Sequence, residues 1–380
     1  MKDHKLLNDL WKEVEAGRVT SSTTNDLTLF KYTQETHIKD LWNDANRQAR
    51  GIIFRADGTI VARPFSKFFN LDERPETEAK NLPWSEGVEV YEKLDGSCGT
   101  GYFIEGRGDW KLATPGSMES DQAIEGTRML NEFIQVPADP LVVPDDWICH
   151  LPDKSVKRYD TEYLPKDCTP VFEIIYPDNR IVVDYRGERK LVLLSIFEHN
   201  GEEWHPRRVD QMAELCGFPR PKRYDIDLRC DISFEDNHEG YVCRFGNGFR
   251  VKVKSPTYLR IHRILNHMSP KGVIDLIRGK EYGVTISQLP KEIAKNFDDI
   301  HAHVQGIHNR IVTRAYENLI TMQNELSIKA NRKEYAQWVT NNVLNSECGF
   351  VFALLDGKDI EEKVWRLVLK TVSDNVTTLD

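Results

Sequence analysis

The sequence lacks several features that would place it in a specialised class of protein. No run of about 18 apolar residues occurs in its 380 residues, so no membrane-spanning helix is predicted. No apolar core follows the first five residues, so a signal peptide is not expected. The seven cysteines are odd in number and show no Cys-x-x-Cys spacing. Their scatter argues against a zinc ribbon and a disulfide scaffold, and favours a reducing cytoplasm.

Positive charge is also in short supply. The chain has 51 Lys and Arg against 60 Asp and Glu, a formal net charge of -9. A general polyanion binder is therefore not expected, and any contact with nucleic acid must come from a local basic surface. The proportions of hydrophobic residues (40%) and charged residues (29%) are those of an ordinary globular protein, long enough for two or three domains.

The stretch around Lys93 organises the rest of the chain. Val88 and Val90 alternate as in a strand, and Asp95-Gly96 predicts a tight turn, so Lys93 is expected at the end of a strand. A lysine in such a place can act as a nucleophile if burial or neighbouring cations suppress its charge. By itself, Lys-x-Asp-Gly is a weak motif that favours a surface lysine in a hairpin turn, and only the other motifs of the chain favour a nucleophile.

Two predicted hairpins carry further basic residues that could act with Lys93. Residues 50–55 and 59–64 flank the turn Asp57-Gly58, with Arg50 and Lys67 at the two ends of this region. The second hairpin comprises residues 240–245 and 249–254. Its alternation predicts two faces, one apolar and one basic, and the basic face carries Arg250, Lys252 and Lys254. From Tyr241 to Lys271 there are seven Lys or Arg and no Asp or Glu, which indicates a local anion site, although a solvated edge strand would show the same charges.

Two carboxylates accompany these basic residues. Glu173 lies inside the apolar run 171–175, where an acid is costly unless it is paired or binds a cation. A turn at Asp178-Asn179 and a returning strand at residues 180–185 are expected next. Glu239 precedes the second hairpin, and such carboxylates suit Mg²⁺ or Mn²⁺ with phosphate oxygens completing the shell. The proline-rich residues 136–170 predict a surface excursion.

The C-terminal third changes character. Residues 258–268 have helical spacing, and a recurrence of apolar residues from Pro290 to Leu326 predicts one amphipathic helix of roughly 35 residues. Shorter helices are predicted near residues 334–344 and 360–369. An all-helical module is therefore expected after a boundary near residues 255–270.

Taken together, these pieces suit a lysine that attacks the α-phosphorus of a nucleoside triphosphate. That lysine must be uncharged, whereas its neighbours Glu92 and Asp95 favour the ammonium. Lys252, Lys254 and a metal ion would oppose them and neutralise the phosphate. Arg50 and Lys67 could hold the outgoing pyrophosphate.

The chain resembles the covalent nucleotidyltransferases, and within them the RNA ligase 1 family of tRNA-repair enzymes from T-even phages. The resemblance runs from about Phe30 to about Arg263. Its motifs are Arg50-Gly51-Ile52-Ile53-Phe54, Arg63-Pro64 with Lys67-Phe68-Phe69-Asn70, Glu92-Lys93-Leu94-Asp95-Gly96-Ser97, Gly116-Ser117, Phe172-Glu173-Ile174 with Asn179-Arg180-Ile181-Val182, Glu239-Gly240-Tyr241-Val242, and Lys252-Val253-Lys254-Ser255.

The resemblance implies a role for each matching residue. Lys93 becomes the AMP-lysine, Arg50 and Lys67 contact phosphates, and Lys252 and Lys254 hold the α-phosphate. Glu173 and Glu239 serve the ribose and the metal. The remaining candidates are Tyr32 and Glu92 as nucleotide contacts, and Asp95, Gly96 and Tyr258 as further site residues.

One position departs from the family pattern. Where the phage family has a lysine before Gly-Ser, this chain has Pro115. The corresponding phosphate contact is either missing or supplied elsewhere, for which Lys111 is the candidate.

The expected fold class is α+β, with an antiparallel-sheet adenylyltransferase domain over residues 1–260 and a helical RNA-specificity domain over residues 261–380. The expected function is an ATP-dependent RNA ligase that joins a 5′-phosphate to a 3′-hydroxyl with ATP and Mg²⁺ or Mn²⁺. Broken tRNA is a plausible substrate, with a separate kinase or phosphatase healing the ends. Two alternatives stay open: an mRNA-capping type of guanylyltransferase, and a non-catalytic protein that binds RNA ends on the same fold.

Overall fold

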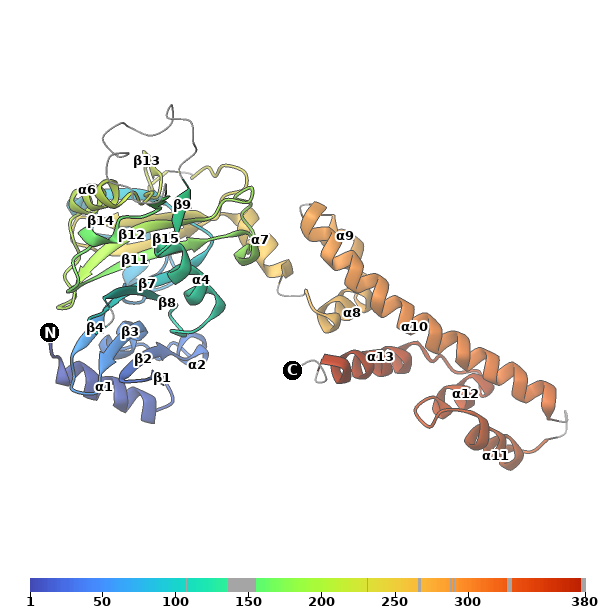
Figure 1. Cartoon of the computed structure of the whole chain (residues 1–380). Coiled ribbons are helices and arrows are strands. Elements are labelled where there is room, and N and C mark those ends of the chain that lie inside the picture. Colours follow the sequence, from blue (N-terminus) through green and yellow to red (C-terminus); the bar gives the residue numbers. More distant parts are fainter. Residues whose placement is uncertain are drawn as a thin grey trace. The chain divides into compact units, whose positions relative to one another are not determined.

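The computed structural model describes residues 1–106, 108–135, 155–230, 232–265, 268–287, 289, 291–326 and 330–376. Residues 136–154 of the expected proline-rich excursion lie outside this set. The chain forms two compact units, Met1–Leu259 and Arg260–Asp380 (Figure 1). Each unit is described by itself.

The first unit is built on β-sheets whose strands are almost all antiparallel. One four-stranded sheet has the order β1 (Val19–Thr24), β2 (Leu27–Tyr32), β3 (Arg50–Arg55), β4 (Ile60–Ala62). A second has the order β12 (Lys190–Glu198), β11 (Cys168–Ile175), β7 (Ser97–Ile104), β8 (Asp109–Ala113). A five-stranded sheet has the order β13 (Arg223–Tyr224), β6 (Val88–Glu92), β14 (Gly240–Phe245), β15 (Arg250–Lys254), β5 (Phe69–Asn70), in which only the β15–β5 pair is parallel. Strands β9 (Phe133–Gln135) and β10 (Ser155–Lys157) form a small fourth sheet.

Helices cover these sheets at several points (Figure 1). They are α1 (His4–Glu15), α2 (Gln34–Ile38), α3 (Asp44–Gln48), α4 (Asp121–Leu130) and α6 (Pro206–Cys216). Helix α7 (Pro256–Leu265) begins in this unit and continues past its last residue, Leu259. Helix α3 begins with a capping box in which Asn43 and Asn46 satisfy each other's backbone amides. This cap fixes the start of a five-residue helix that leads directly into β3 and Arg50.

The hairpin of β14 and β15 has the two faces that its alternation predicted. Tyr241, Cys243 and Val251 are buried in an apolar cluster on one face. Lys252 lies opposite Val242 and Lys254 opposite Gly240 in the antiparallel register, on the other face. The basic residues of this hairpin are therefore gathered in one row.

The expected strand at residues 180–185 does not form. Within this segment, the backbone amides of Val182 and Val183 both donate to Oδ2 of Asp95 at 2.8 Å. These two amides are therefore not available for hydrogen bonds to a neighbouring strand, and the segment forms a loop.

The second unit is helical throughout its described residues. Its helices are α8 (Pro270–Arg278), α9 (Tyr282–Ile286), α10 (Lys291–Glu325), α11 (Arg332–Asn342), α12 (Cys348–Leu355) and α13 (Glu361–Val376). Helix α10 has 35 residues, as expected, and its apolar seam is buried at Phe297, Val304, Ile311 and Met322. The predicted α+β class, with sheets followed by an all-helical C-terminal part, is confirmed. Helix α12, an apolar segment without the helical periodicity of its neighbours, was not predicted.

The six cysteines in the described part of the chain are all free thiols. Among the described residues, no helix has both the length and the apolar character needed to cross a bilayer.

Candidate active site

Lys93 follows β6 immediately and meets the start of β14. Its backbone N–H donates to the carbonyl of Gly240 at 2.8 Å. Its side-chain amine lies 2.7 Å from Oε2 of Glu239, a carboxylate that is only 3% exposed. The amine of Lys254 lies 3.0 Å from Oε1 of the same carboxylate. Three residues predicted from separate motifs therefore form one charge cluster.

Asp95 ties the turn after Lys93 to the surrounding chain. Besides the amides of Val182 and Val183, its carboxylate accepts a hydrogen bond from the hydroxyl of Tyr258 at 2.7 Å. Its own backbone N–H donates to the hydroxyl of Tyr185 at 2.8 Å. Asp95 is 3% exposed. Asp95 and Tyr258 therefore position the turn that follows Lys93.

Gly96 brings Glu173 to the site. Its N–H donates to Oε1 of Glu173 at 3.0 Å, and a Cβ at position 96 would lie 2.5 Å from the carbonyl oxygen of Ile174. Only glycine permits this approach of β7 to β11. Burial raises the pKa of Glu173 to about 7, although the nearby Lys93 opposes this shift and the carboxylate of Glu239 reinforces it.

Cations outnumber carboxylates around Lys93. Burial, and then the charges of Arg50, Lys67, Lys93 and Lys254, hold the pKa of Lys252 well below its usual value. The ring of Phe68, which was not predicted as a site residue, lies 5.2 Å from the guanidinium carbon of Arg50 and 5.0 Å from the amine of Lys252.

Arg50 carries a further sign of an anion site. Its Nη1 is buried and has no hydrogen-bond partner within the described residues. A cluster of this composition, with a buried donor left over, favours a bound polyanion.

Lys67 occupies an aromatic cage. Its amine lies 5.3 Å from the ring centre of Tyr32, and 5.2 Å from the ring centres of both Trp42 and Phe69. Burial lowers the pKa of Lys67 to about 8. Tyr32 therefore lies near the site, where its ring contacts the amine of Lys67. The contribution of Trp42 was missed, because no motif contains it.

Glu92 ends β6 beside Lys93. It lines a narrow slot of about 80 Å³, together with Tyr91, Val242 and Leu194. Val242 lies opposite Tyr91 on one strand pair and opposite Lys252 on the other. The slot therefore adjoins the lysine cluster and presents mainly apolar walls, but its volume is well below that of ligand pockets, which is roughly 300 Å³ or more.

The turn that carries Pro115 in place of the family lysine lies close to another cation. A Cβ at Gly116 would lie 2.9 Å from the amine of Lys31. Lys31 is also the cross-strand partner of Arg50. Lys111, the substitute expected from the sequence, lies on β8 opposite Tyr102. Lys31 is thus better placed than Lys111 to substitute for the family lysine. In the sequence, only its position next to Tyr32 pointed to it.

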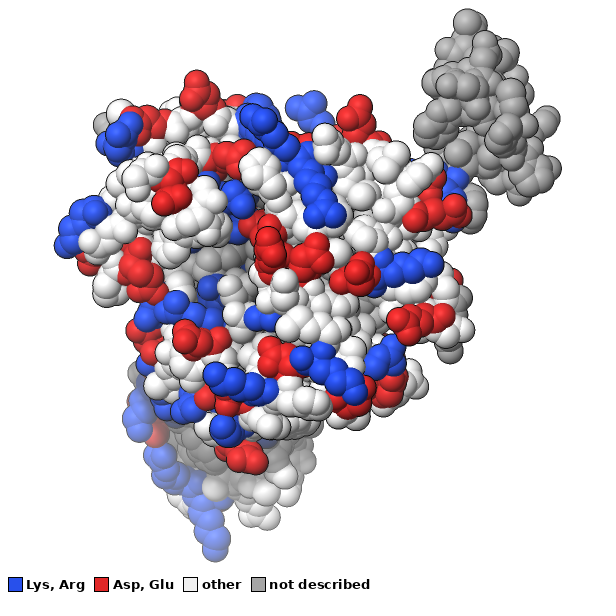
Figure 2. Space-filling view, turned by 90° about the vertical axis from the view of Figure 1, so that its left-hand side faces the viewer, with Lys and Arg blue, Asp and Glu red and all other residues white. Residues whose placement is uncertain are grey.

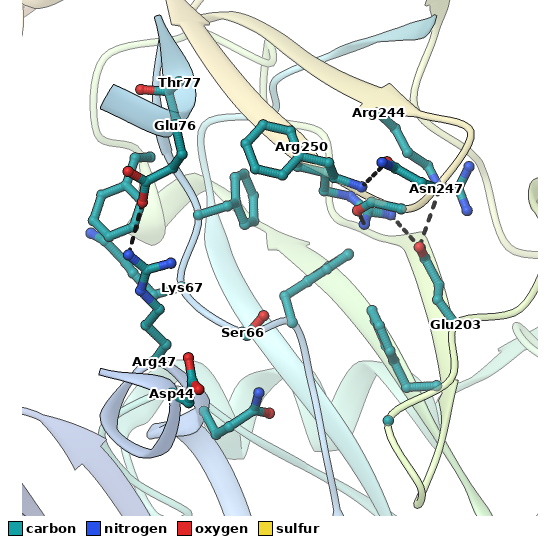
Figure 3. A pocket seen from close by; sticks show the side chains of 18 of the residues that line it. Asp44, Arg47, Ser66, Lys67, Glu76, Thr77, Glu203, Arg244, Asn247 and Arg250 are labelled. Carbon is teal, nitrogen blue, oxygen red and sulfur yellow. Dashed lines mark hydrogen bonds and ion pairs between the residues drawn. The ribbon is translucent and has the colours of Figure 1, made fainter. Parts of the chain in front are cut away.

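A cavity of about 710 Å³ lies beside this cluster (Figure 3). Of the predicted site residues, only Lys67 lines it; Lys93, Glu239 and Lys252 do not. The candidate active site is therefore the charge cluster around Lys93, and the cavity lies next to it.

The carboxylates present could hold a divalent cation only with help from a substrate. Within the described residues, there is no group of three or more His, Cys, Asp or Glu that could coordinate a metal. Glu173 and Glu239 remain the two acidic candidates, and their mutual proximity raises the pKa of Glu173. Two carboxylates completed by phosphate oxygens and water fit Mg²⁺ or Mn²⁺.

Charged side chains of both signs are mixed on the surface. Figure 2 shows acidic and basic side chains interspersed over one face, without one extensive basic patch. The clustered cations described above belong to the interior of the site.

Comparisons with known proteins identify the family of this chain. The sequence pattern of a family described as "RNA ligase" matches residues 48–258. A protein of Thermovibrio ammonificans that carries a provisional RNA ligase name is 30% identical over 68% of this chain and 64% of its own length. The RNA ligase of Rhodothermus phage RM378 is 22% identical over 92% of this chain and 89% of its own. The chain thus spans less than two thirds of the Thermovibrio protein.

Among solved structures, an archaeal ATP-dependent RNA ligase aligns over 89% of each chain with a TM-score of 0.46 and 12% identity. The family match covers more than half of the 380 residues and contains Lys93, Glu173, Glu239 and Lys252. The chain therefore belongs to the T4-type RNA ligase family of the covalent nucleotidyltransferases.

Proposed function

We propose that this protein is an ATP-dependent RNA ligase that joins a 5′-phosphate to a 3′-hydroxyl. The observation that carries the proposal is the cluster of Lys93, Glu239 and Lys254 inside the matched region, with Lys252 and Arg50 nearby. A lysine at the end of a strand, surrounded by further cations, is suited to attack a phosphorus atom and to tolerate the charge that develops there.

The reaction has three steps. The uncharged amine of Lys93 attacks the α-phosphorus of ATP, an N–P bond forms, and pyrophosphate leaves with the electron pair of the broken P–O bond. An oxygen of the RNA 5′-phosphate then attacks the same phosphorus and the lysine leaves, which gives an RNA-adenylate. Finally the RNA 3′-hydroxyl attacks the activated 5′-phosphate, AMP leaves, and the hydroxyl proton is released.

Each residue of the cluster has a proposed part in these steps. Lys252 and Lys254 hold the α-phosphate, while Arg50 and Lys67 hold the outgoing pyrophosphate. Glu92 contacts the nucleotide, and Glu173 contacts the ribose or the metal. A divalent cation held at Glu239 and Glu173 supplies charge neutralisation on the phosphates. Asp95 and Tyr258 keep the turn in place through their 2.7 Å hydrogen bond.

The second unit is proposed to select the RNA. The residues that the chemistry needs end at Tyr258, before the unit begins at Arg260. Lys295 and Arg310 on the long helix α10 offer charges to an RNA backbone. RNA-specific contacts commonly fall on loops and single strands, so a broken tRNA loop is the proposed target, with separate enzymes healing its ends. The free thiols suit a reducing cytoplasm.

The test of the central proposal is intact-mass measurement after incubation with ATP and Mg²⁺. The protein should gain one AMP, and Lys93→Arg should gain none while keeping a cation beside Glu239. GTP is the matched control, because a guanylate adduct would indicate a capping type of enzyme. An adduct that persists in Lys93→Arg would refute the assignment of the nucleophile, and no adduct with either nucleotide would favour a non-catalytic RNA-end-binding protein.

The role of the second unit has its own test. A chain that ends after α7 keeps Tyr258 and its bond to Asp95. If this chain adenylates itself and seals simple ends but no longer prefers structured breaks, the helical unit selects RNA. An unchanged preference would contradict that role.

A further inference from the structure

The first two steps of the proposed reaction make use of the same side of one phosphorus atom. In an in-line displacement the entering and leaving atoms lie opposite each other. Pyrophosphate therefore leaves on the side opposite Lys93 in the first step. In the second step Lys93 itself leaves, so the RNA 5′-phosphate must enter where pyrophosphate departed. This argument rests on the proposed function and asks what lies beyond that position.

Lys67 connects that position to the 710 Å³ cavity. The residue that follows Lys67 is Phe68, whose ring contacts both Arg50 and Lys252, so Lys67 lies next to the phosphate-binding cluster. Lys67 also lines the cavity, at the wall shown beside Arg47 in Figure 3. A chain that follows the 5′-phosphate away from the cluster can therefore pass Lys67 into the cavity.

The wall beside Lys67 has an excess of positive charge. Arg47 Nη2 contacts Oε1 of Glu76 at 2.8 Å, and Arg74 Nε contacts the same oxygen at 3.1 Å. The guanidinium carbons of Arg47 and Arg74 lie 5.2 and 4.7 Å from the ring centre of Phe69. Moreover, Nε of Arg47 is buried without a hydrogen-bond partner within the described residues. Arg74 also pairs with Asp40 and does not line the cavity, so the cation left over at this wall is Lys67.

The opposite wall repeats this arrangement. Nε of Arg244 lies 3.2 Å from Oε2 of Glu203, and Arg250 donates to Oε1 of the same carboxylate (Figure 3). Two further acids, Asp44 and Glu202, line the cavity but are exposed at its rim. Counted with these two, the lining has as many carboxylates as cations. The excess of cations is confined to its inner part, where Arg47, Lys67, Arg244 and Arg250 accompany Glu76 and Glu203.

Aromatic rings lie between the two charged walls. Phe65, Phe68, Phe197 and Phe249 line the cavity, and Phe68 and Phe249 keep part of their surface exposed. Cationic walls interleaved with aromatic rings are the usual lining of sites for single-stranded nucleic acid, because phosphates meet the cations and bases stack on the rings. The volume is within the range of pockets that enclose a small organic ligand, so a nucleotide can be accommodated.

We propose that this cavity binds the 5′-terminal nucleotides of the RNA strand that supplies the 5′-phosphate. The phosphate passes Lys67 into the position that pyrophosphate vacates. The first nucleosides then lie between the Arg47 wall and the Arg250 wall. The strand that supplies the 3′-hydroxyl does not use the cavity.

The test separates the three steps in the full-length protein. Lysine-AMP formation is measured with ATP alone. AMP transfer is measured with a 5′-phosphorylated oligoribonucleotide whose 3′ end is blocked, over a range of concentrations. The last step is measured with a pre-adenylated oligoribonucleotide and varied concentrations of a 3′-hydroxyl strand.

Arg47→Gln is the first variant, and Arg128→Gln is its matched control. Arg128 is likewise a helical arginine paired with a glutamate, but it lies on α4 outside the cavity and is 62% exposed. Arg47→Gln should form lysine-AMP within about twofold of the parent. Its KM for the 5′-phosphorylated strand should rise at least about tenfold, the scale of losing one charged contact. Arg128→Gln should change neither quantity.

Asn247→Asp provides a second, nearly isosteric variant. The side-chain oxygen of Asn247 accepts the N–H of Phe249 at 3.0 Å, and an aspartate can keep this bond. The added negative charge on the cavity wall should raise the same KM about threefold or more, and the effect should shrink with added salt.

The outcomes distinguish this inference from the proposed function. If the parent protein forms no lysine-AMP, the proposed function itself fails. If the parent forms it and transfers AMP, but both variants have the parent's KM for the 5′-phosphorylated strand, the cavity assignment is wrong. An increase confined to the KM of the 3′-hydroxyl strand would overturn it as well, because the cavity would then hold the other strand.

Discussion

The amine of Lys93 and the carboxylate of Glu239 are held 2.7 Å apart, and Lys254 contacts the other oxygen of that carboxylate at 3.0 Å. Lys93, the proposed nucleophile, is therefore in an ion pair in this structure. In the proposed reaction Glu239 would hold the divalent cation, so its ion pair with Lys93 would have to break before the amine can attack. We therefore expect the freeing of the amine to be coupled to the binding of ATP and its cation.

Glu239→Gln tests this coupling. Glutamine keeps the shape but loses the charge that binds a cation, so lysine-AMP formation should fall by at least about a hundredfold at saturating ATP and Mg²⁺. Quantitative intact mass over time gives the rate. A rate close to that of the parent would remove Glu239 from the metal and lysine roles proposed here.

Lys252→Met should separate activity from stability. The buried amine lies among Arg50, Lys67, Lys93 and Lys254, so replacing it with an apolar chain relieves repulsion and the burial of a charge. We expect lysine-AMP formation to fall at least about a hundredfold while the melting temperature stays equal or rises. Retained adenylation would contradict the phosphate-binding role, and a lower melting temperature would contradict the account of the charge cluster.

The Asp95–Tyr258 hydrogen bond should be structural. Burial raises the pKa of Tyr258, which supports its hydroxyl as the donor to Asp95. Tyr258→Phe leaves a buried carboxylate oxygen without this donor and should lower the free energy of unfolding by about 1–3 kcal/mol. Asp95→Asn should be at least as destabilising, because it also weakens the bonds from Val182 and Val183. The double variant should be less destabilised than the sum, as chemical denaturation can show; full additivity would mean that the two side chains act independently.

Lys67 should make ATP binding depend on pH. Because burial lowers its pKa to about 8, the amine loses its proton as the pH rises through that value and then attracts phosphate less. The KM for ATP should rise above pH 8, at most about tenfold per pH unit for one proton. Lys67→Arg stays charged over this pH range. Dividing the KM of the parent protein by the KM of Lys67→Arg therefore removes the effect of other titrating groups. If that ratio is constant from pH 7 to 9.5, Lys67 does not contact the phosphates in its charged form.

Lys31 and Lys111 compete as substitutes for the family lysine that Pro115 replaces. Lys31 is beside Arg50 in the sheet register and close to Gly116, so Lys31→Ala should slow lysine-AMP formation about tenfold. Lys111→Ala is the matched control and should have little effect. The reverse result, measured by the same intact-mass assay, would restore the expectation based on the sequence.

Local patterns in the sequence determined the individual elements. The alternation of residues 249–254 predicted a strand with a basic and an apolar face, and the spacing after Pro290 predicted a helix of about 35 residues, because these periods follow directly from strand and helix geometry. The order of the motifs also identified Lys93, Glu173, Glu239 and Lys252 as members of one site. The roles of these residues remain predictions until the experiments above are done.

Only the tertiary structure decided which side chains meet. Lys93 and Glu239 are 146 residues apart, and Asp95 and Tyr258 are 163 apart. The expected strand at residues 180–185 became a loop because a distant carboxylate takes two of its amides. Such contacts depend on the register in which β6 pairs with β14. They also depend on which polar groups become buried, because a buried polar group needs a hydrogen-bond partner. No local period encodes this information, since it exists only once the sheets have been assembled.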